Sequence, residues 1–268
     1  MATKIHPTAI VSKSSYLDEN VVVGSYAIVG DNVKIGAGTV LDSFAQVIGY
    51  TRIGKNCKIF SSAVIGSAPQ DLKYKDAKSY IIVGDNNQIR EFVTVNPGTD
   101  EGSKTVIGSD NLLMAYSHIA HDCCVGSGNI LANGTTLAGY VTIEDKVVIG
   151  GLVAVHQFCR VGTFSIVGGC SKVVQDIPPY SVCDGHPAGV YGINLVGLRR
   201  AKFSTQAIKN LKTAFKILFF QGHSVSTAKD MLKANNLSSP EIDYLVEFIA
   251  TSKRGIRRHK MKIDKIGS

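Results

Sequence analysis

The chain has 268 residues, 44% of them hydrophobic, with 27 glycines and no tryptophan. This length suits one large domain or a domain with an appendage, and the many glycines indicate a backbone that turns often. No apolar stretch is long enough to span a membrane, and the first residues lack the apolar segment of a signal peptide. We therefore expect a cytoplasmic protein without an integral membrane segment.

The net charge of +8 is unevenly distributed. Residues 1–186 carry 14 Lys and Arg against 16 Asp and Glu, whereas residues 187–268 carry 15 against 5. A near-neutral body with a basic carboxy-terminal region suits an acidic protein partner. A solvated helical surface explains the same charge equally well.

A six-residue repeat dominates the first two thirds of the chain. Every sixth residue from Ile5 to Ile65 is Ile, Val or Leu, and the spacing is unbroken again from Ile107 to Val173. This period fits neither a helix nor an exposed strand, whose periods are about 3.6 and 2 residues. It indicates one short strand and one turn per repeat, with three repeats closing each triangular coil. The sequence therefore predicts a mainly β protein built as a parallel β-helix.

The repeat is interrupted near 67–82 and 99–106, where we expect inserted loops. It stops at Pro178-Pro179, because proline cannot continue a hydrogen-bonded ladder. The predicted domains are a β-helix over 1–186 and a carboxy-terminal helical domain with a basic tail over 187–268. A glycine-rich connector is expected to lead to helices that begin at Ser204 and then cover 226–235 and 240–252. The tail from residue 253 is expected to be loosely ordered.

Candidate catalytic residues follow from the coil geometry. Residues three repeats apart share one column, with about 4.8 Å between coils. Gly139 and Gln157 follow His121 at that spacing, so an imidazole, a glycine and an amide are predicted to lie in one external column. His118 precedes this group and His156 adjoins Gln157, which brings three histidines to one edge.

Asp122 directly follows His121 and suits it to act as a general base, since a carboxylate orients the ring and stabilises its protonated form. The chain has no G-x-S-x-G motif, so direct transfer to a hydroxyl is simpler than a covalent intermediate. Surface histidines of a polar coil are the plain alternative. A metal site is not expected, because no cysteine or carboxylate cluster completes a tetrahedral set. The inserted segment with Gln70, Asp71 and Lys73 is suited to gripping a polar substrate.

Several motifs resemble one enzyme family closely. The chain is similar to the acyl-carrier-protein-dependent UDP-N-acetylglucosamine O-acyltransferases of lipid A biosynthesis, which are left-handed parallel β-helices built from hexapeptide repeats. The resemblance covers nearly the whole chain, including the carboxy-terminal helices. It rests on Gln70-Asp71-Leu72-Lys73-Tyr74, Asp110-Asn111-Leu112-Leu113-Met114, His118-Ile119-Ala120-His121-Asp122-Cys123, Leu137-Ala138-Gly139, Ala154-Val155-His156-Gln157-Phe158-Cys159, Gly168-Gly169-Cys170 and Gln175-Asp176-Ile177-Pro178-Pro179-Tyr180.

The resemblance implies a function for most of these positions. His121 would deprotonate the sugar 3-hydroxyl as it attacks a 3-hydroxyacyl thioester, with Asp122 behind it and the N–H of Gly139 stabilising the oxyanion. Gly169 would lie at the position that limits the length of the acyl chain, and Arg200 would contact the phosphates of the nucleotide sugar. The remaining substrate-binding positions implied by the resemblance are Gln70, Asp71, Lys73, His118, His156, Gln157 and Asn194.

The same resemblance implies a homotrimer with acyl carrier protein and UDP-N-acetylglucosamine as partners and no nucleic acid. No resident cofactor or metal is implied, because the 4'-phosphopantetheine arrives on the carrier protein. Asn96, Tyr140 and Val196 depart from residues common in the family and leave the acceptor and the acyl preference open. The alternatives are N-acylation of the 3-amino analogue of the sugar, another hexapeptide-repeat acyltransferase, and a non-catalytic solenoid.

Overall fold

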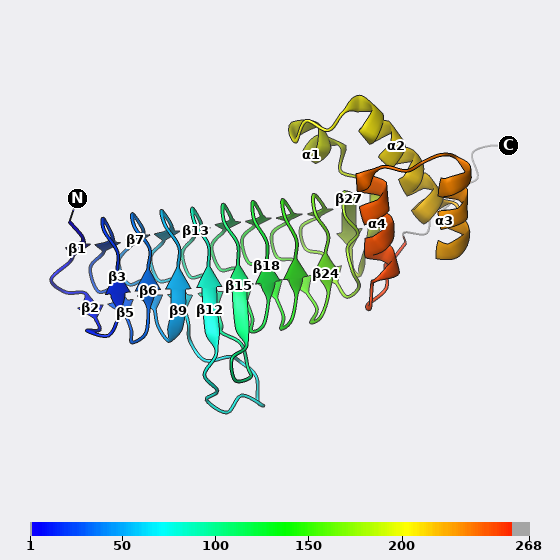
Figure 1. Cartoon of the computed structure of the whole chain (residues 1–268). Coiled ribbons are helices and arrows are strands. Elements are labelled where there is room, and N and C mark those ends of the chain that lie inside the picture. Colours follow the sequence, from blue (N-terminus) through cyan, green and yellow to red (C-terminus); the bar gives the residue numbers. More distant parts are fainter. Residues whose placement is uncertain (1, 259–268) are drawn as a thin grey trace.

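The computed structural model describes residues 2–258 as a long triangular stack of β coils, with the helices gathered at its carboxy-terminal end (Figure 1). Within these residues the short strands form three sheets, named A, B and C here in the order in which the chain visits them. Sheet A holds β1 Lys4–Ile5, β4 Val22–Val23, β7 Val40–Leu41, β10 Lys58–Ile59, β13 Gln88–Ile89, β16 Leu112–Leu113, β19 Ile130–Leu131, β22 Val148–Ile149, β25 Ile166–Val167, β27 Ser181–Gly185 and β28 Ala188–Ile193.

The other two sheets complete the triangle. Sheet B holds β2 Ile10–Val11, β5 Ile28–Val29, β8 Gln46–Val47, β11 Val64–Ile65, β14 Thr94–Val95, β17 His118–Ile119, β20 Thr136–Leu137, β23 Ala154–Val155 and β26 Lys172–Val173. Sheet C holds β3 Tyr16–Leu17, β6 Lys34–Ile35, β9 Tyr50–Ile53, β12 Tyr80–Val83, β15 Lys104–Ile107, β18 Cys124–Val125, β21 Thr142–Ile143 and β24 Arg160–Val161.

The strands pair in parallel with the predicted register. Thr136 pairs with Ala154, which lies three repeats further along the chain. The two insertions lengthen this separation where they occur, so that Thr94 pairs with His118. The three turns of each coil form three corners, named A/B, B/C and C/A after the sheets that they join. At any given level of the stack, the outward-pointing side chains therefore lie on three separate edges.

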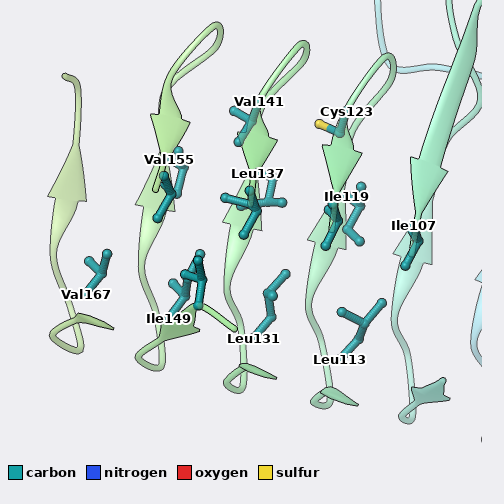
Figure 2. Packing of buried hydrophobic residues seen from close by; sticks show 14 of the residues in the cluster. Ile107, Leu113, Ile119, Cys123, Leu131, Leu137, Val141, Ile149, Val155 and Val167 are labelled. Atoms are coloured by element: carbon teal, nitrogen blue, oxygen red, sulfur yellow. The ribbon is translucent and has the colours of Figure 1, made fainter. Parts of the chain in front are cut away.

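The repeated apolar residues fill the interior of the coil, as the sequence predicted. Figure 2 shows successive layers of inward-pointing side chains, among them Leu113, Leu131 and Ile149 from sheet A and Ile119, Leu137 and Val155 from sheet B. All six are at most 2% exposed. Burying a side chain of this size contributes about 1.5–3 kcal/mol. The stacked layers make the coil a rigid base for side chains on its outer edges.

Both insertions leave the stack at the B/C corner, beside β12 and β15 (Figure 1). The first runs over 66–79 and the second over 96–103. Asn96, which is 2% exposed, donates from Nδ2 to the carbonyl oxygens of Ser67 and Ala68 at 3.0 and 3.2 Å. The buried Asn96 amide thus ties the first loop to the coil.

The helical region follows a β-hairpin. β27 extends sheet A in parallel to β25 and then pairs antiparallel with β28, so the segment predicted as a connector holds a hairpin and a short helix instead. The predicted boundary at residue 186 falls between these two strands. The helices are α1 Leu195–Arg200, α2 Thr205–Phe215, η1 Lys216–Phe220 (a π-helical turn), α3 Val225–Ala234 and α4 Pro240–Ala250.

The three helices predicted after the connector begin within one residue of their predicted starts. Ser204, Ser224 and Ser239 each cap a helix by accepting a backbone N–H of the first turn. No helix among residues 2–258 is long and apolar enough to cross a membrane.

The predicted loose tail is wrong for residues 253–258. This part returns to the coil, where the N–H of Asp176 donates to the carbonyl oxygen of Gly255 at 2.8 Å and that of Val190 to the carbonyl oxygen of Arg257 at 3.1 Å. Backbone hydrogen bonds of this kind leave no sequence signal, because any residue supplies the groups. Residues 259–268 lie outside the described part of the chain.

Candidate active site

His121 and Asp122 form a hydrogen-bonded pair at the B/C corner. The Nδ1 of His121 lies 2.9 Å from Oδ2 of Asp122, and their side chains are only 13% and 8% exposed. Asp122 adopts a left-handed backbone conformation with φ of 59°, which Asp tolerates better than most residues. This turn brings two sequence neighbours side by side. A carboxylate at Nδ1 leaves Nε2 as the nitrogen able to accept a proton.

The Asp122 carboxylate is held in its ionised form. Thr99, from the second inserted loop, donates to Oδ2 from its backbone N–H at 3.1 Å and from its hydroxyl at 2.9 Å. Burial opposes ionisation of Asp122, but the hydrogen bonds from His121, Thr99 and Ser103 outweigh it and lower the pKa of the carboxyl. The inserted loop therefore supports the negative charge that stabilises a protonated His121.

Gly139 lies against the face of His121, one coil further along. A Cβ at this position would overlap the imidazole ring, so only glycine allows the ring to take this place. Within residues 2–258 the N–H of Gly139 has no hydrogen-bond acceptor, although the residue is buried.

Tyr140 closes one side of this arrangement. Its ring meets His121 edge-on, with centroids 5.3 Å apart, and stacks on Phe158. Its hydroxyl lies 3.2 Å from that of Thr99, which continues the hydrogen-bond chain to Asp122.

His118 stands next to this pair on the outer face of β17. Its Nδ1 lies 2.7 Å from the hydroxyl of Thr94. Burial, followed by the nearby His121, lowers the pKa of His118, so the ring is neutral at physiological pH. Thr94 precedes His118 by one coil plus the second insertion, and counting that insertion would have identified it from the sequence.

The first inserted loop brings Asp71 over the imidazole. Its Oδ2 lies 3.7 Å from Nε2 of His121, while its Oδ1 accepts the backbone N–H of Lys73 at 2.8 Å. Gln70 and Lys73 are exposed beside it. The proton-accepting nitrogen thus faces a loop with polar and charged groups, and a substrate hydroxyl would reach it from this side.

Gln157 and His156 lie further along the same corner. Gln157 shares the column of His121 and Gly139, two coils from the imidazole, and both residues are exposed. The Nδ1 of His156 lies 3.2 Å from the carbonyl oxygen of Gln157 and 3.2 Å from Nη2 of Arg254. Arg254 was not among the predicted residues, and its wide separation from His156 along the chain gives no sequence signal.

The remaining predicted residues lie away from this corner. Gly169 is exposed at the A/B corner, between β25 and β26. Asn194 is 4% exposed beside the C/A corner, where Nδ2 donates to the carbonyl oxygen of Phe164 at 2.8 Å and Oδ1 caps α1. Arg200 is exposed at the end of α1. A single chain therefore does not bring these three residues together with His121.

The arrangement at the B/C corner suits proton transfer coupled to acyl transfer. It offers a base backed by an ionised carboxylate, a free backbone N–H beside it and a polar loop opposite. Among residues 2–258 no group of three or more His, Cys, Asp or Glu side chains is arranged to hold a metal ion.

Two family models match the chain. The model described as "Udp N-acetylglucosamine O-acyltransferase; Domain 2" matches residues 176–257, and that of the bacterial transferase hexapeptide (six repeats) matches residues 104–139. The first covers the helical region with the returning tail, and the second covers the coils that carry His121 and Gly139.

Relatives that align with this chain over nearly their full length carry names that agree with the first family model. Acyl-[acyl-carrier-protein]–UDP-N-acetylglucosamine O-acyltransferases from Thermodesulfovibrio yellowstonii and Paraburkholderia phymatum are 49% and 44% identical to this chain, over 95% and 96% of it and 99% and 100% of their own lengths. The structure of LpxA from Acinetobacter baumannii superimposes with a TM-score of 0.91 at 44% identity, over 95% of this chain and 99% of that one. The predicted left-handed β-helix of hexapeptide repeats is thereby confirmed. The chain belongs to the acyl-[acyl-carrier-protein]–UDP-N-acetylglucosamine O-acyltransferase family and is an acyltransferase.

Proposed function

We propose that the chain transfers a 3-hydroxyacyl group from acyl carrier protein to the 3-hydroxyl of UDP-N-acetylglucosamine, the first step of lipid A biosynthesis. The names of its full-length relatives support both substrates. The observation that carries the chemistry is the contact of His121 with Asp122 on one side and Gly139 on the other. N-acylation of a 3-amino sugar is not favoured, because these relatives are O-acyltransferases.

The reaction uses few groups. Nε2 of His121 takes the proton of the sugar 3-hydroxyl while its oxygen attacks the thioester carbonyl. The N–H of Gly139 donates to the oxyanion of the tetrahedral intermediate, and Asp122 stabilises the protonated ring. Collapse of the intermediate forms the ester and breaks the carbon–sulfur bond, and the proton on His121 passes to the departing thiolate of the 4'-phosphopantetheine. No other cofactor is required.

The substrate-binding groups lie mainly on the same corner. Asp71 faces Nε2 of His121 at 3.7 Å and is suited to hold the acceptor sugar, with Gln70 and Lys73 beside it on the loop. His118, His156 and Gln157 extend along the outer edge. Gly169 and Asn194 lie at the other two corners of the coil, and Arg200 lies at the end of α1.

We also propose a cytoplasmic homotrimer. A bound nucleotide sugar and its acyl chain would contact all the implied residues only where the B/C corner of one copy faces the other corners of a neighbour. A cyclic trimer of triangular prisms provides that geometry three times. Free buried thiols such as Cys123 and Cys183 are usual in a reducing compartment.

Acyl carrier protein would dock on the basic helical region. Arg199, Lys209 and Lys212 line one hollow with Phe203 and Ile208, at the ends of α1 and α2. A positive surface next to an apolar floor suits an acidic partner and raises the rate of encounter.

The proposal is tested by product analysis. The protein is incubated with a 3-hydroxyacyl carrier protein and either UDP-N-acetylglucosamine or its 3-amino analogue, and the products are measured by mass spectrometry before and after mild alkali. We expect an alkali-labile ester on UDP-N-acetylglucosamine, and none with His121→Ala or with acetyl-coenzyme A as donor. Acylation of the 3-amino sugar alone would contradict the proposal.

A further inference from the structure

The carboxy-terminal strap, defined here as residues 252–258, binds along the same corner as His121. Ser252 donates from its hydroxyl to Oδ2 of Asp176 at 2.7 Å, and Asp176 donates from its N–H to the carbonyl oxygen of Gly255 at 2.8 Å. Gln175 donates from Nε2 to the carbonyl oxygen of Arg254 at 3.3 Å. These contacts fix the backbone of Arg254 against the last coil.

The Arg254 side chain then reaches back toward the site. Its Nη2 donates to the carbonyl oxygen of Val174 at 3.1 Å and lies 3.2 Å from Nδ1 of His156. Its Nε is buried and has no hydrogen-bond partner among residues 2–258. A guanidinium anchored in this way presents a fixed N–H to the imidazole.

This contact decides which ring nitrogen of His156 carries the proton. Arg has only donors, so Nδ1 must accept and the proton of the neutral ring must lie on Nε2. The carbonyl oxygen of Gln157, 3.2 Å from the same Nδ1, favours the opposite tautomer. The guanidinium outweighs the carbonyl oxygen, because a charged donor makes a hydrogen bond about twice as strong as a neutral one. Gln157 is exposed, so water can serve its carbonyl oxygen instead.

We propose that Arg254 is a positioning residue for His156, which it holds as the Nε2–H tautomer so that Nε2 donates to an oxygen of the bound nucleotide sugar. The inference rests on the proposed function for the substrate, but the tautomer itself is independent of activity. Through this contact the carboxy-terminal strap contributes to binding the acceptor sugar, because Arg254 orients His156, which lies two coils from His121.

The kinetic test is a double-mutant cycle. Arg254→Met keeps an unbranched apolar stem and removes the guanidinium donors, and we expect it to lower kcat/KM for the nucleotide sugar by about tenfold, the loss of one charged hydrogen bond. Arg254→Lys should recover part of this loss. In a His156→Ala background, Arg254→Met should have no further effect, because the acceptor of its hydrogen bond is already gone. Equal losses in both backgrounds would overturn the inference and indicate a role in strap stability alone.

Arg257→Met is the matched control. It removes a neighbouring exposed charge from the same strap, and we expect its kinetics for both substrates to match those of the wild type. A tenfold loss here as well would assign the effect to general charge and overturn the inference.

Nitrogen NMR of ¹⁵N-histidine-labelled protein supplies a readout that needs no activity. The His156 signal is identified by its loss in His156→Gln. Above the pH at which the ring is protonated, we expect Nδ1 to be unprotonated in the wild type and to become protonated in a large fraction of Arg254→Met. A wild-type ring protonated at Nδ1 would overturn the inference. Failure of the wild type to acylate the sugar would instead overturn the proposed function.

Discussion

The imidazole of His121 lies directly against Gly139, one coil further along the chain, with no room for a side chain between them. The contact places the base of the proposed reaction next to a backbone N–H, both on a rigid stack. It also makes the site sensitive to a single methyl group, because the neighbouring coil cannot move away without breaking its ladder.

Gly139→Ala tests this contact. The added Cβ overlaps the ring of His121, so the ring must rotate away from Asp122 or the coil must shift. We expect acyl transfer to fall by about a hundredfold, similar to the loss of a positioned general base, with the β-sheet circular dichroism retained. Gly192→Ala, in β28 where an added Cβ would meet nothing within 4 Å, is a control for a glycine substitution away from the site. Near-full activity of folded Gly139→Ala would contradict the tight packing.

A second prediction concerns the pH dependence of stability. The pKa of Asp122 is lowered in the folded protein, so its ionised form stabilises the fold above its unfolded pKa of about 3.9 and this contribution is lost as pH falls through the lower folded value. We therefore expect Asp122→Asn to lower the melting temperature at pH 7 and the difference from wild type to shrink below about pH 4. Both proteins share every other carboxyl, so the difference isolates Asp122 and its partner His121. A difference that stayed constant over this range would argue against an ionised, hydrogen-bonded Asp122.

The acyl chain is expected to run past Gly169. A Cβ at this position would meet only the carbonyl oxygen and nitrogen of Gly151, at 3.4 and 3.8 Å, so the fold should accept a larger residue. Gly169→Met should then occupy space that a long acyl chain would need and shift the preference toward shorter donors. The check is kcat/KM over a series of acyl carrier proteins that differ in acyl length, and an unchanged ranking would mean that the acyl chain runs elsewhere.

The basic hollow of the helical region is expected to bind the donor. Charge reversal at Arg199, Lys209 or Lys212 should raise KM for acyl carrier protein and leave KM for the nucleotide sugar almost unchanged. The effect should weaken with salt, since charges more than about 8 Å apart are screened at physiological ionic strength. Reversal of Lys55, an exposed lysine on the coil, is the control. A donor KM insensitive to both salt and charge would rule out this surface.

The coil was predictable because its register is fixed. Once the period of six was recognised, the burial of Leu131 or Val155 and the shared column of His121, Gly139 and Gln157 followed from counting alone. The helix starts at Ser204 and Ser239 were equally predictable, because a helix cap and the first turn after it are recognised from adjacent residues.

The remaining features depend on where a loop or chain end happens to fold. Thr99 reaches Asp122 through the conformation of an inserted loop, and no period relates the two residues. The hairpin of β27 and β28 replaces an expected connector, because proline ends the hexads without ending sheet A. Arg254 meets His156 only after the chain has passed through every helix and returned. Such contacts are tertiary and leave no trace in local sequence.

The central claim is that His121 is the general base. The most direct measurement is the rate of acyl transfer from 3-hydroxyacyl carrier protein to UDP-N-acetylglucosamine by His121→Ala, with the wild type as reference and with retained β-sheet circular dichroism and a cooperative melting transition as proof of folding. We predict a loss of at least about a hundredfold, the low end for removal of a general base. A folded His121→Ala protein that retained near wild-type activity would contradict the account.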